Sequence, residues 1–250
     1  MSHSSRVHLA VPRTVALLVA IFAFACGLGY VVVREAVTQT IEHQALAVAE
    51  IVASQATVAR SVYAQEIAAK LSKDGFGPSV DSATKPGHVP IPAQFLKLVG
   101  RASSSKADKL YEYKPVSKWN LESNQGLSDD FLRWAWPQLE SQDQARPTAP
   151  IAWKPVSRFE EQNGRRVLRY LSADPASQVS CVACHNTYEQ SAAILAQRRS
   201  DGVPQGKVWV QHQLLGALSV TIQLDKAEKI AGSQTKQATL FFFAILTASF

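Results

Sequence analysis

One pentapeptide of the chain, Cys181-Val182-Ala183-Cys184-His185, combines two thiols and an imidazole at a spacing that suits an iron porphyrin. Two intervening residues let both sulfurs bond to the vinyl groups on one edge of a haem, and the adjacent histidine can bond to the iron. We therefore predict that Cys181 and Cys184 bind one covalent haem c per chain. His185 is the predicted iron ligand.

Two other readings of the same residues are a structural zinc half-site and a thioredoxin-type redox pair. Zinc would need two further Cys or His ligands at short spacing, but the only other cysteine, Cys26, lies in an apolar segment near the N-terminus. A redox pair is expected near a βαβ pattern, whereas residues 186–190 are polar. The sequence favours haem over both.

An apolar segment near the N-terminus predicts on which side of a membrane the haem motif lies. Residues 15–33 are nineteen consecutive apolar or small positions, enough at about 1.5 Å per residue to cross a hydrocarbon core of roughly 30 Å. Arg6 and Arg13 precede this predicted transmembrane helix, which favours a cytoplasmic N-terminus over residues 1–14. Because haem c is attached outside the cytoplasm, we expect a bacterial inner-membrane protein whose main domain is periplasmic.

A cleaved signal peptide is the alternative for this segment. Ala23-Phe24-Ala25 has the small-x-small form that a signal peptidase accepts. The apolar run continues eight residues beyond Ala25, however, so a retained membrane anchor is the preferred interpretation.

Residues 238–250 form a second apolar stretch, which at thirteen residues is too short to span a bilayer. We interpret it as the start of a second transmembrane helix in a longer protein, with an output enzyme such as a kinase or cyclase beyond residue 250. A C-terminal core helix or an interfacial anchor is the alternative. On the first interpretation residues 34–237 are one periplasmic domain between two spans.

Composition limits the partners of that domain. About two hundred residues can bury a core without disulfides, and only Cys26 remains once the haem cysteines are used. The net charge of +6 contains no long basic run, so nucleic acid is not an expected partner. The positive balance suits haem propionates or anionic lipid headgroups instead.

The predicted periplasmic domain begins with a long helix. Glycine and proline are absent between Glu35 and Lys73, and apolar residues recur at helical spacing on one stripe, which predicts a helix of about 58 Å. Because several residues of the stripe are small, a second helix can approach closely, and we expect a homodimer; packing on the chain's own domain is the alternative. The stripe consists of Ile41, Ala45, Val48, Val52, Ala56, Ala59, Tyr63, Ile67 and Leu71.

Short helices and strands follow. Ser128-Asp129-Asp130 resembles a helix N-cap, although Pro137 is expected to bend or break that helix. Asn163-Gly164 is a favoured two-residue hairpin corner. The other predicted elements are a helix at 95–99, hairpin strands at 158–161 and 165–172, and two later strands at 207–211 and 215–224. The predicted fold class is α+β, with an antiparallel sheet behind a long N-terminal helix and transmembrane helices at both ends.

Four segments together resemble the periplasmic c-type haem sensor domains of PAS-like fold. They are Arg60-Ser61-Val62-Tyr63, His88-Val89-Pro90-Ile91-Pro92-Ala93, Ser180 to Asn186 around the haem motif, and Leu215-Gly216-Ala217-Leu218-Ser219-Val220. The resemblance spans roughly residues 40–225. It implies a PAS-like sheet, haem on Cys181 and Cys184 with His185 as proximal ligand, and a place at the N-terminus of histidine kinases, nucleotide cyclases or chemoreceptors.

The sixth iron position decides what such a haem can do, and the sequence leaves it open. Met1 is the only methionine, and Cys26 lies at membrane depth, so both are excluded. A vacant position would permit binding of a diatomic gas. The protein candidates are His43, His88, His212 and, more weakly, Tyr63; Arg60 and Arg169 are weak candidates for pairing with the propionates.

Three functional classes fit a periplasmic haem. We expect a sensor that detects redox state or a diatomic gas and signals across the membrane. The alternative is a membrane-anchored monohaem electron carrier. Enzyme activity within these residues is not expected, because no cluster of histidine and carboxylate accompanies the haem motif; no catalytic residue is predicted.

Overall fold

The structure is a computed structural model that describes residues 4–105, 110–122 and 125–248. The chain divides into two compact units. One comprises the residues up to Gln44 together with those from Asp225 onward, and the other comprises Ala45–Leu224. Each is described separately below.

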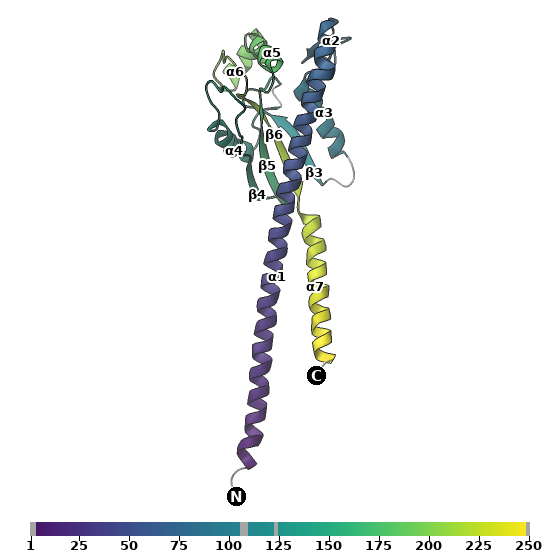
Figure 1. Ribbon diagram of the computed structural model, residues 1–250, viewed down its shortest axis with the longest axis vertical. Helices are drawn as coiled ribbons and strands as arrows, with labels where there is room; N and C mark the ends of the chain where they lie inside the picture. Colours follow the sequence, from purple (N-terminus) through teal and green to yellow (C-terminus); the bar gives the residue numbers. More distant parts are fainter. Residues whose placement is uncertain (1–3, 106–109, 123–124, 249–250) are drawn as a thin grey trace. The chain divides into compact units, whose positions relative to one another are not determined.

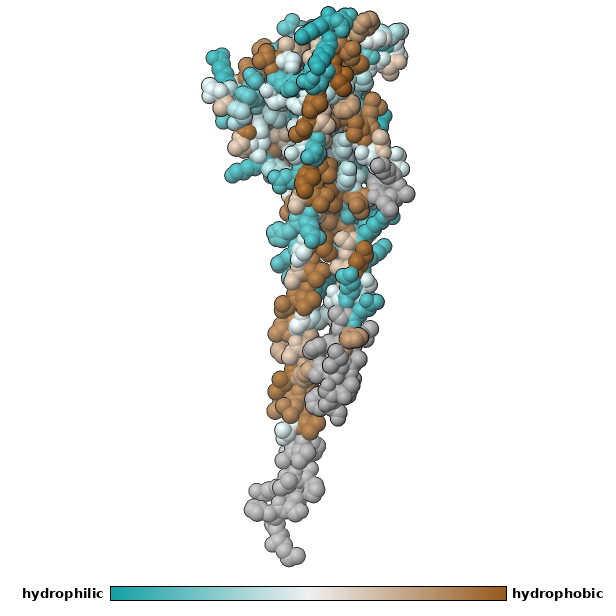
Figure 2. Space-filling model, turned by 45° about the vertical axis from the view of Figure 1, so that its right-hand side comes forward, coloured by the Kyte–Doolittle hydropathy of each residue, from teal (hydrophilic) through white to brown (hydrophobic). Residues whose placement is uncertain are grey.

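The first unit contains the predicted membrane anchor. Of the helices in the described ranges, one is long and apolar enough by length and composition to cross a membrane: Thr14–Lys73, with a mean hydropathy of 2.5 in its most apolar part. Figure 2 shows brown, apolar side chains along this segment. Helix α7, Asp225–Ala248, contains most of the predicted second span. Residues 249 and 250 lie outside the described residues, so that span stays a prediction.

The long helix predicted from Glu35 to Lys73 is confirmed with its end at Lys73, but it begins at Ser4 and includes the apolar segment (Figure 1). Helix α1 (Ser4–Val62) continues through a π-helical segment, η1 (Tyr63–Ala68), into α2 (Ala69–Lys73). Gly75, with φ of 80°, follows in a left-handed conformation that glycine adopts without strain. The π-helical segment was not predicted, and it adds a residue to one turn of the helix.

The buried face of α1 differs from the predicted stripe. Val48 and Ile67, which belong to that stripe, are 42% and 46% exposed. The buried residues are mainly small, which allows close approach of the helix to its own domain. They are Ala45, Ala49, Ala53, Ala56, Arg60 and Tyr63.

The second unit is built on a four-stranded antiparallel sheet. Its strand order is β3-β6-β5-β4, so the first strand lies beside the last. The strands are β3 (Tyr111–Val116), β4 (Val156–Gln162), β5 (Arg165–Pro175) and β6 (Leu214–Gln223). The predicted α+β class and antiparallel sheet are therefore present; a PAS-like fold remains an expectation.

Two strand predictions have different outcomes. The hairpin at Asn163-Gly164 is confirmed, with positive φ values of 52° and 72° at the two corner residues. The strand expected at 207–211 is wrong. That segment pairs with no strand among the described residues, because the Asn186 side chain forms hydrogen bonds with both the N–H and the C=O of Trp209. A turn follows, in which His212 has φ of 73°.

Helices complete the second unit. The Asp129 N-cap of α4 is confirmed, since its carboxylate accepts a hydrogen bond from the Leu132 N–H at 2.9 Å. Pro137 does not break α4, which continues to Glu140. The helices are α3 (Pro92–Ser104), α4 (Asp130–Glu140), α5 (Val179–Glu189) and α6 (Ala192–Ser200), and the two-residue strands β1 (Pro78–Ser79) and β2 (Val89–Pro90) pair in parallel.

The hydrophobic core lies between α4 and the sheet (Figure 1). Helix α4 buries Phe131, Leu132, Trp136 and other apolar side chains against β5 and β6. Each such side chain contributes roughly 1.5–3 kcal/mol when fully buried. Cys181 and Val182 of α5 pack at the edge of the same cluster, so the haem motif rests on the core of the domain.

Candidate haem-binding site

Helix α5 carries all three residues of the predicted haem motif. No helix or strand is predicted for the motif from the sequence, and the structure places it within a helix that begins at Val179. Residues three and four positions apart share a helix face, so Cys181 lies on the same side as Cys184 and His185. Helical geometry therefore points both thiols and the imidazole in one direction.

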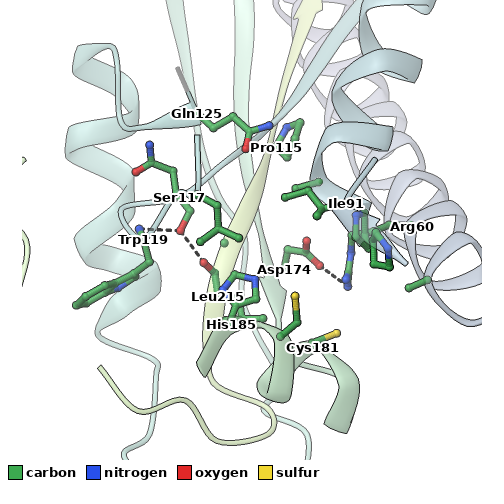
Figure 3. A pocket seen from close by; sticks show the side chains of 18 of the residues that line it. Arg60, Ile91, Pro115, Ser117, Trp119, Gln125, Asp174, Cys181, His185 and Leu215 are labelled. Carbon is green, nitrogen blue, oxygen red and sulfur yellow. Dashed lines mark hydrogen bonds and ion pairs between the residues drawn. The ribbon is translucent and has the colours of Figure 1, made fainter. Parts of the chain in front are cut away.

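These three side chains line a single cavity of about 380 Å³. Figure 3 shows Cys181 and His185 at one end of it, and Gln125 and Pro115 at the other. The remaining wall is largely apolar. It includes residues of the helix end (Arg60, Ala64, Ala68), of the segment before α3 (Ile91, Pro92), of β3 (Pro115, Val116), of β5 (Asp174) and of β6 (Leu215, Gly216, Ala217).

His185 is held as a neutral imidazole. Burial lowers its pKa to about 4, and the positive charges of Arg198 and Arg60 act in the same direction. Its Nδ1 atom is buried and has no hydrogen-bond partner within the described ranges, and the ring meets the indole of Trp209 edge to face with 5.9 Å between the ring centroids. A neutral imidazole keeps a free lone pair at pH 7, which a metal ligand requires.

The two cysteines are free thiols rather than a disulfide. Burial, with a smaller contribution from Cys181, raises the pKa of the Cys184 thiol. A catalytic redox cysteine shows the opposite shift, because its thiolate is the nucleophile. The environment of Cys184 therefore argues against the thioredoxin-type alternative.

A buried ion pair joins α1 to the sheet inside this cavity. Arg60 Nη2 lies 2.7 Å from Asp174 Oδ1, and both side chains are largely buried. The negative charge of Asp174 raises the pKa of Arg60, whereas burial raises the pKa of Asp174. Arg60 therefore lines the same cavity as Cys181, Cys184 and His185, but its charge is already paired with an aspartate, and its pairing with a propionate stays a prediction.

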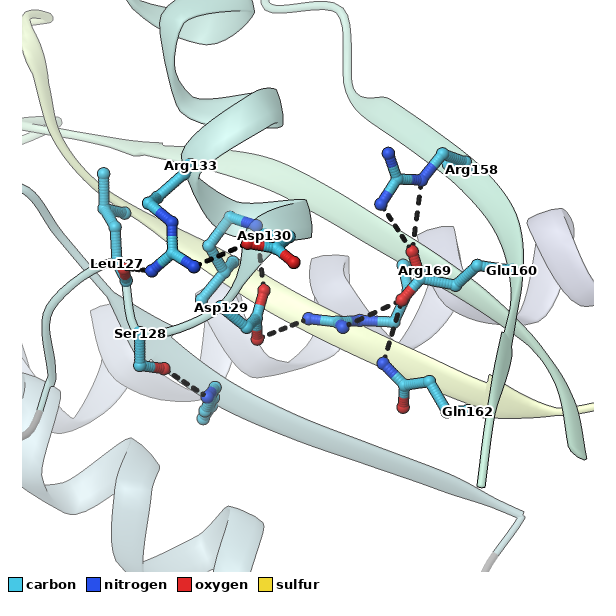
Figure 4. Close-up of polar contacts among 11 residues, drawn as sticks. Leu127, Ser128, Asp129, Asp130, Arg133, Arg158, Glu160, Gln162 and Arg169 are labelled. Atoms are coloured by element: carbon cyan, nitrogen blue, oxygen red, sulfur yellow. Dashed lines mark hydrogen bonds and ion pairs between the residues drawn. The ribbon is translucent and has the colours of Figure 1, made fainter. Parts of the chain in front are cut away.

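The second arginine proposed for the propionates lies elsewhere. Arg169 binds Asp129 at 3.0 Å and Glu160 at 3.2 Å (Figure 4). It does not line the cavity, so its pairing with a propionate is not supported. The Arg169 cluster instead ties the N-cap of α4 to strands β4 and β5.

Polar contacts fix both ends of α5. At its N-terminus, Gln178 Nε2 donates to Ser61 Oγ of α1 at 3.0 Å. Near its C-terminus, the Asn186 amide donates to the C=O of Trp209 at 3.1 Å and accepts from its N–H at 2.7 Å. These contacts leave α5 little freedom to rotate Cys181, Cys184 and His185 away from the cavity.

Glu189, at the last position of α5, forms a fully buried ion pair with Arg198 of α6. Arg198 Nη2 lies 2.5 Å from Glu189 Oε1, and the side chains are 0% and 1% exposed. The guanidinium also donates to the C=O groups of Trp119 and Asn120 at 3.0 and 2.8 Å. One arginine thus connects α5, α6 and a loop that lines the cavity.

The candidates for the sixth iron position are not among the described residues that line the cavity. The Tyr63 hydroxyl donates to the C=O of Pro90 at 2.7 Å, and His88 Nδ1 lies 3.2 Å from the C=O of Pro86. His43 is exposed on α1. His212, which directly follows the segment expected to be a strand at 207–211, lies in a turn.

The donor set fits a haem better than a bare metal ion. Within residues 4–105, 110–122 and 125–248, no group of three or more His, Cys, Asp or Glu side chains is arranged to hold a metal by itself. The cavity is apolar, and three of its buried nitrogen atoms lack a hydrogen-bond partner among the described residues: His185 Nδ1, Gln125 Nε2 and Arg60 Nε. A group with an iron atom and carboxylates would satisfy a site of this composition.

Sequence reasoning did not identify Asp174, Ser117 or Gln125 as site residues. Ser117 Oγ donates to the C=O of Leu215 at 2.6 Å and accepts from the N–H of Trp119 at 2.9 Å, so it shapes the wall of the cavity. Asp174 lies five residues before Val179, where α5 begins. This closeness in sequence to the haem motif is the one local signal of its role. No local signal marks Gln125.

Comparison with known proteins gives one match. The family model described as Tll0287-like (Tll0287) matches residues 38–223, which includes the haem motif and all of the sheet. No curated protein and no solved structure shows significant similarity to the chain.

Proposed function

The chain belongs to the Tll0287-like family, and we propose that it is a membrane-anchored periplasmic sensor domain that carries a covalent haem c. The observation that carries the proposal is the convergence of Cys181, Cys184 and a neutral His185 on one apolar cavity. The apolar anchor in α1 supports placement at a membrane. A haem c would supply an iron atom that changes its charge or its axial ligand.

Each residue of the motif has a separate task in this proposal. Cys181 and Cys184 would hold the porphyrin through thioether bonds, and His185 would occupy one axial position of the iron. Trp209, packed against the imidazole, restricts the orientation of the ring. Apart from the motif, the described residues that line the cavity include no strong iron ligand, and we propose that the iron would also bind a small diatomic molecule.

The cavity contacts α1, the helix whose N-terminal part contains the apolar segment. Two contacts connect the haem-bearing region to consecutive residues of α1: Asp174 with Arg60, and Gln178 with Ser61. Since α1 also contains the apolar segment, a rearrangement in the cavity would act directly on the helix that enters the membrane. A simple electron carrier has no need of such a connection.

An exposed apolar seam on α1 supports the predicted homodimer. Val48, Ile51, Val58, Val62 and Ile67 are all exposed and follow one another at steps of 3, 7, 4 and 5 residues. Steps of three, four and seven follow the heptad repeat of a coiled coil. The step of five crosses η1, whose wider turn keeps Ile67 on the same side.

We assign this seam to a second, parallel copy of the chain. Two copies anchored in one membrane by the same segment run in the same direction, so each apolar seam residue would face its own equivalent. The Arg60 and Tyr63 face of the helix stays with its own domain. The seam shares Val48 and Ile67 with the stripe expected from the sequence, and its other three residues lie outside that stripe.

Spectroscopy with a distance measurement tests the sensor proposal. A spin label at exposed position 54 on α1, beside the seam and introduced as Ser54→Cys in a Cys26→Ser background, reports the separation of the two copies in lipid nanodiscs. Carbon monoxide, nitric oxide or a change of iron oxidation state should alter both the haem spectrum and this separation. A label that does not respond while the iron is reduced and reoxidised reversibly would point to the electron carrier and contradict the sensor.

A further inference from the structure

A second cavity adjoins the haem cavity. It has a volume of about 480 Å³, lies between α3 and β3, and shares two lining residues, Pro115 and Gln125, with the first. The remaining lining residues are Lys97, Gly100, Arg101, Ser104, Ser105, Glu112, Tyr113 and Lys114. Most residues that line the first cavity are apolar, whereas most residues that line the second are of polar or charged types.

Cations predominate in the second cavity. Helix α3 supplies Lys97 and Arg101, and β3 supplies Lys114 together with one acid, Glu112. Lys97 also pairs at 2.6 Å with Glu122, which lies outside the lining. Even with both acids counted, the surroundings carry a net positive charge that would attract an anionic group.

Gln125 provides an independent sign of a ligand at the junction of the two cavities. The residue is 7% exposed, and its Nε2 atom has no hydrogen-bond partner in the described part of the chain. A buried N–H donor without an acceptor costs about 1–3 kcal/mol. An acceptor group that enters the cavity would remove this cost.

The chemistry of haem c identifies that acceptor. The thioether bonds fix the vinyl edge of the porphyrin, and the two propionates project from the opposite edge. In Figure 3, Gln125 and Pro115 lie across the cavity from Cys181, so a porphyrin bound at the cysteines extends toward them. Ligand pockets usually measure about 300–1,000 Å³, and the first cavity is at the small end of this range for so large a group.

We propose that the second cavity is the propionate site of this haem, with Gln125 as a hydrogen-bond donor and Arg101, Lys114 and Lys97 as the cations that keep the carboxylates ionised. The inference rests on the proposed function, because it requires the haem. The carboxylates would then lie among Lys97, Arg101, Glu112, Lys114 and Glu122, with the Arg60–Asp174 pair on the side of the first cavity.

This arrangement predicts how the protein tunes the iron. Ionised propionates stabilise ferric iron, and nearby cations offset that effect and lower the propionate pKa. Removal of the cations should therefore lower the reduction potential of the haem and raise the pH at which the potential becomes dependent on propionate protonation.

The test compares two charge-matched double variants of the full chain, matured with covalent haem in detergent. Arg101→Gln/Lys114→Gln removes two exposed cations of the second cavity, and Arg146→Gln/Lys154→Gln removes two exposed cations that line neither cavity. We expect the first pair to lower the potential and to shift its pH dependence upward, and the control to change neither. Equal potentials and equal pH profiles in the two variants would overturn the proposal.

Gln125→Leu gives a second readout that does not depend on net charge. Leucine is of similar size but lacks the amide donor, so the resonance Raman bending mode of the propionates should fall in frequency, as it does when hydrogen bonding to the carboxylates weakens. An unchanged mode contradicts the role of Gln125. If the wild-type chain carries no covalent haem at all, the proposed function fails before this site is tested.

Discussion

Replacing Arg198 by methionine tests whether the buried ion pair with Glu189 holds the haem-bearing helix in place. Methionine retains most of the buried side-chain volume but removes the charge. Glu189, which is 1% exposed, would then be a buried carboxylate without its cation. The C=O groups of Trp119 and Asn120 would each lose a hydrogen bond from the guanidinium.

The expected cost follows from these contacts. Removing one partner of a buried ion pair typically destabilises a protein by about 3–5 kcal/mol. Because the total stability of a domain is about 5–15 kcal/mol, we expect Arg198→Met to lower the free energy of unfolding by about 3–5 kcal/mol. The haem cavity should loosen as well, since Trp119 and Asn120 line it.

Urea unfolding of the chain in detergent, followed by tryptophan fluorescence, measures this change. Arg199→Met is the matched control, because Arg199 is adjacent to Arg198 but exposed. In the described part of the chain its guanidinium donates one hydrogen bond, to the Gln205 side chain. Its replacement should therefore lower the free energy of unfolding by less than about 0.5 kcal/mol. The double variant Arg198→Met/Glu189→Leu should recover part of the loss. A cost below about 1 kcal/mol for Arg198→Met, or a double variant less stable than the single one, would refute the reasoning.

Three further predictions concern other parts of the molecule. Gly100→Ala would place a Cβ 2.5 Å from the Tyr113 carbonyl oxygen and should lower the stability measured by thermal unfolding by about 1–3 kcal/mol. In the control Gly232→Ala, the added Cβ meets no atom within 4 Å, so this variant should not be destabilised. Equal effects of the two substitutions would contradict the packing of α3 on β3. The haem-free chain should lose up to about 3 kcal/mol of stability as the pH falls from about 6.5 to about 4, because the pKa of His185 is about 4 when folded and near 6.5 when unfolded. His185→Gln should flatten that dependence in urea titrations at each pH, and a slope that persists in the variant would assign it to another group. Val58→Glu on the exposed seam should convert the dimer to a monomer in sedimentation experiments, and a persistent dimer would exclude the seam as the interface.

Local patterns were sufficient for the features that depend on neighbouring residues. The haem motif, the helix ending at Lys73, the Asp129 N-cap and the Asn163-Gly164 corner each depend on a few consecutive residues, and the last three are confirmed. Helical spacing also implies a shared face for the two thiols and the imidazole, once the motif is known to be helical.

Long-range contacts explain what the sequence did not reveal. Strand β3 was missed because Pro115 weakens its pattern, and the strand forms by pairing Tyr111 to Val116 with β6 far along the chain. The stripe on α1 was misplaced because Arg60, a charged residue, is buried by its pairing with Asp174. Periodicity alone cannot show that a charged residue is buried while Val48 is exposed.

The most direct test of the central claim is whether iron porphyrin is bonded to Cys181 and Cys184. The chain is produced with a working cytochrome c maturation system, extracted with acidified acetone and examined as its pyridine haemochrome. We predict one haem per chain that stays with the polypeptide and is lost in Cys181→Ala/Cys184→Ala. A wild-type chain that is colourless, or whose pigment passes entirely into the acetone, would contradict the account.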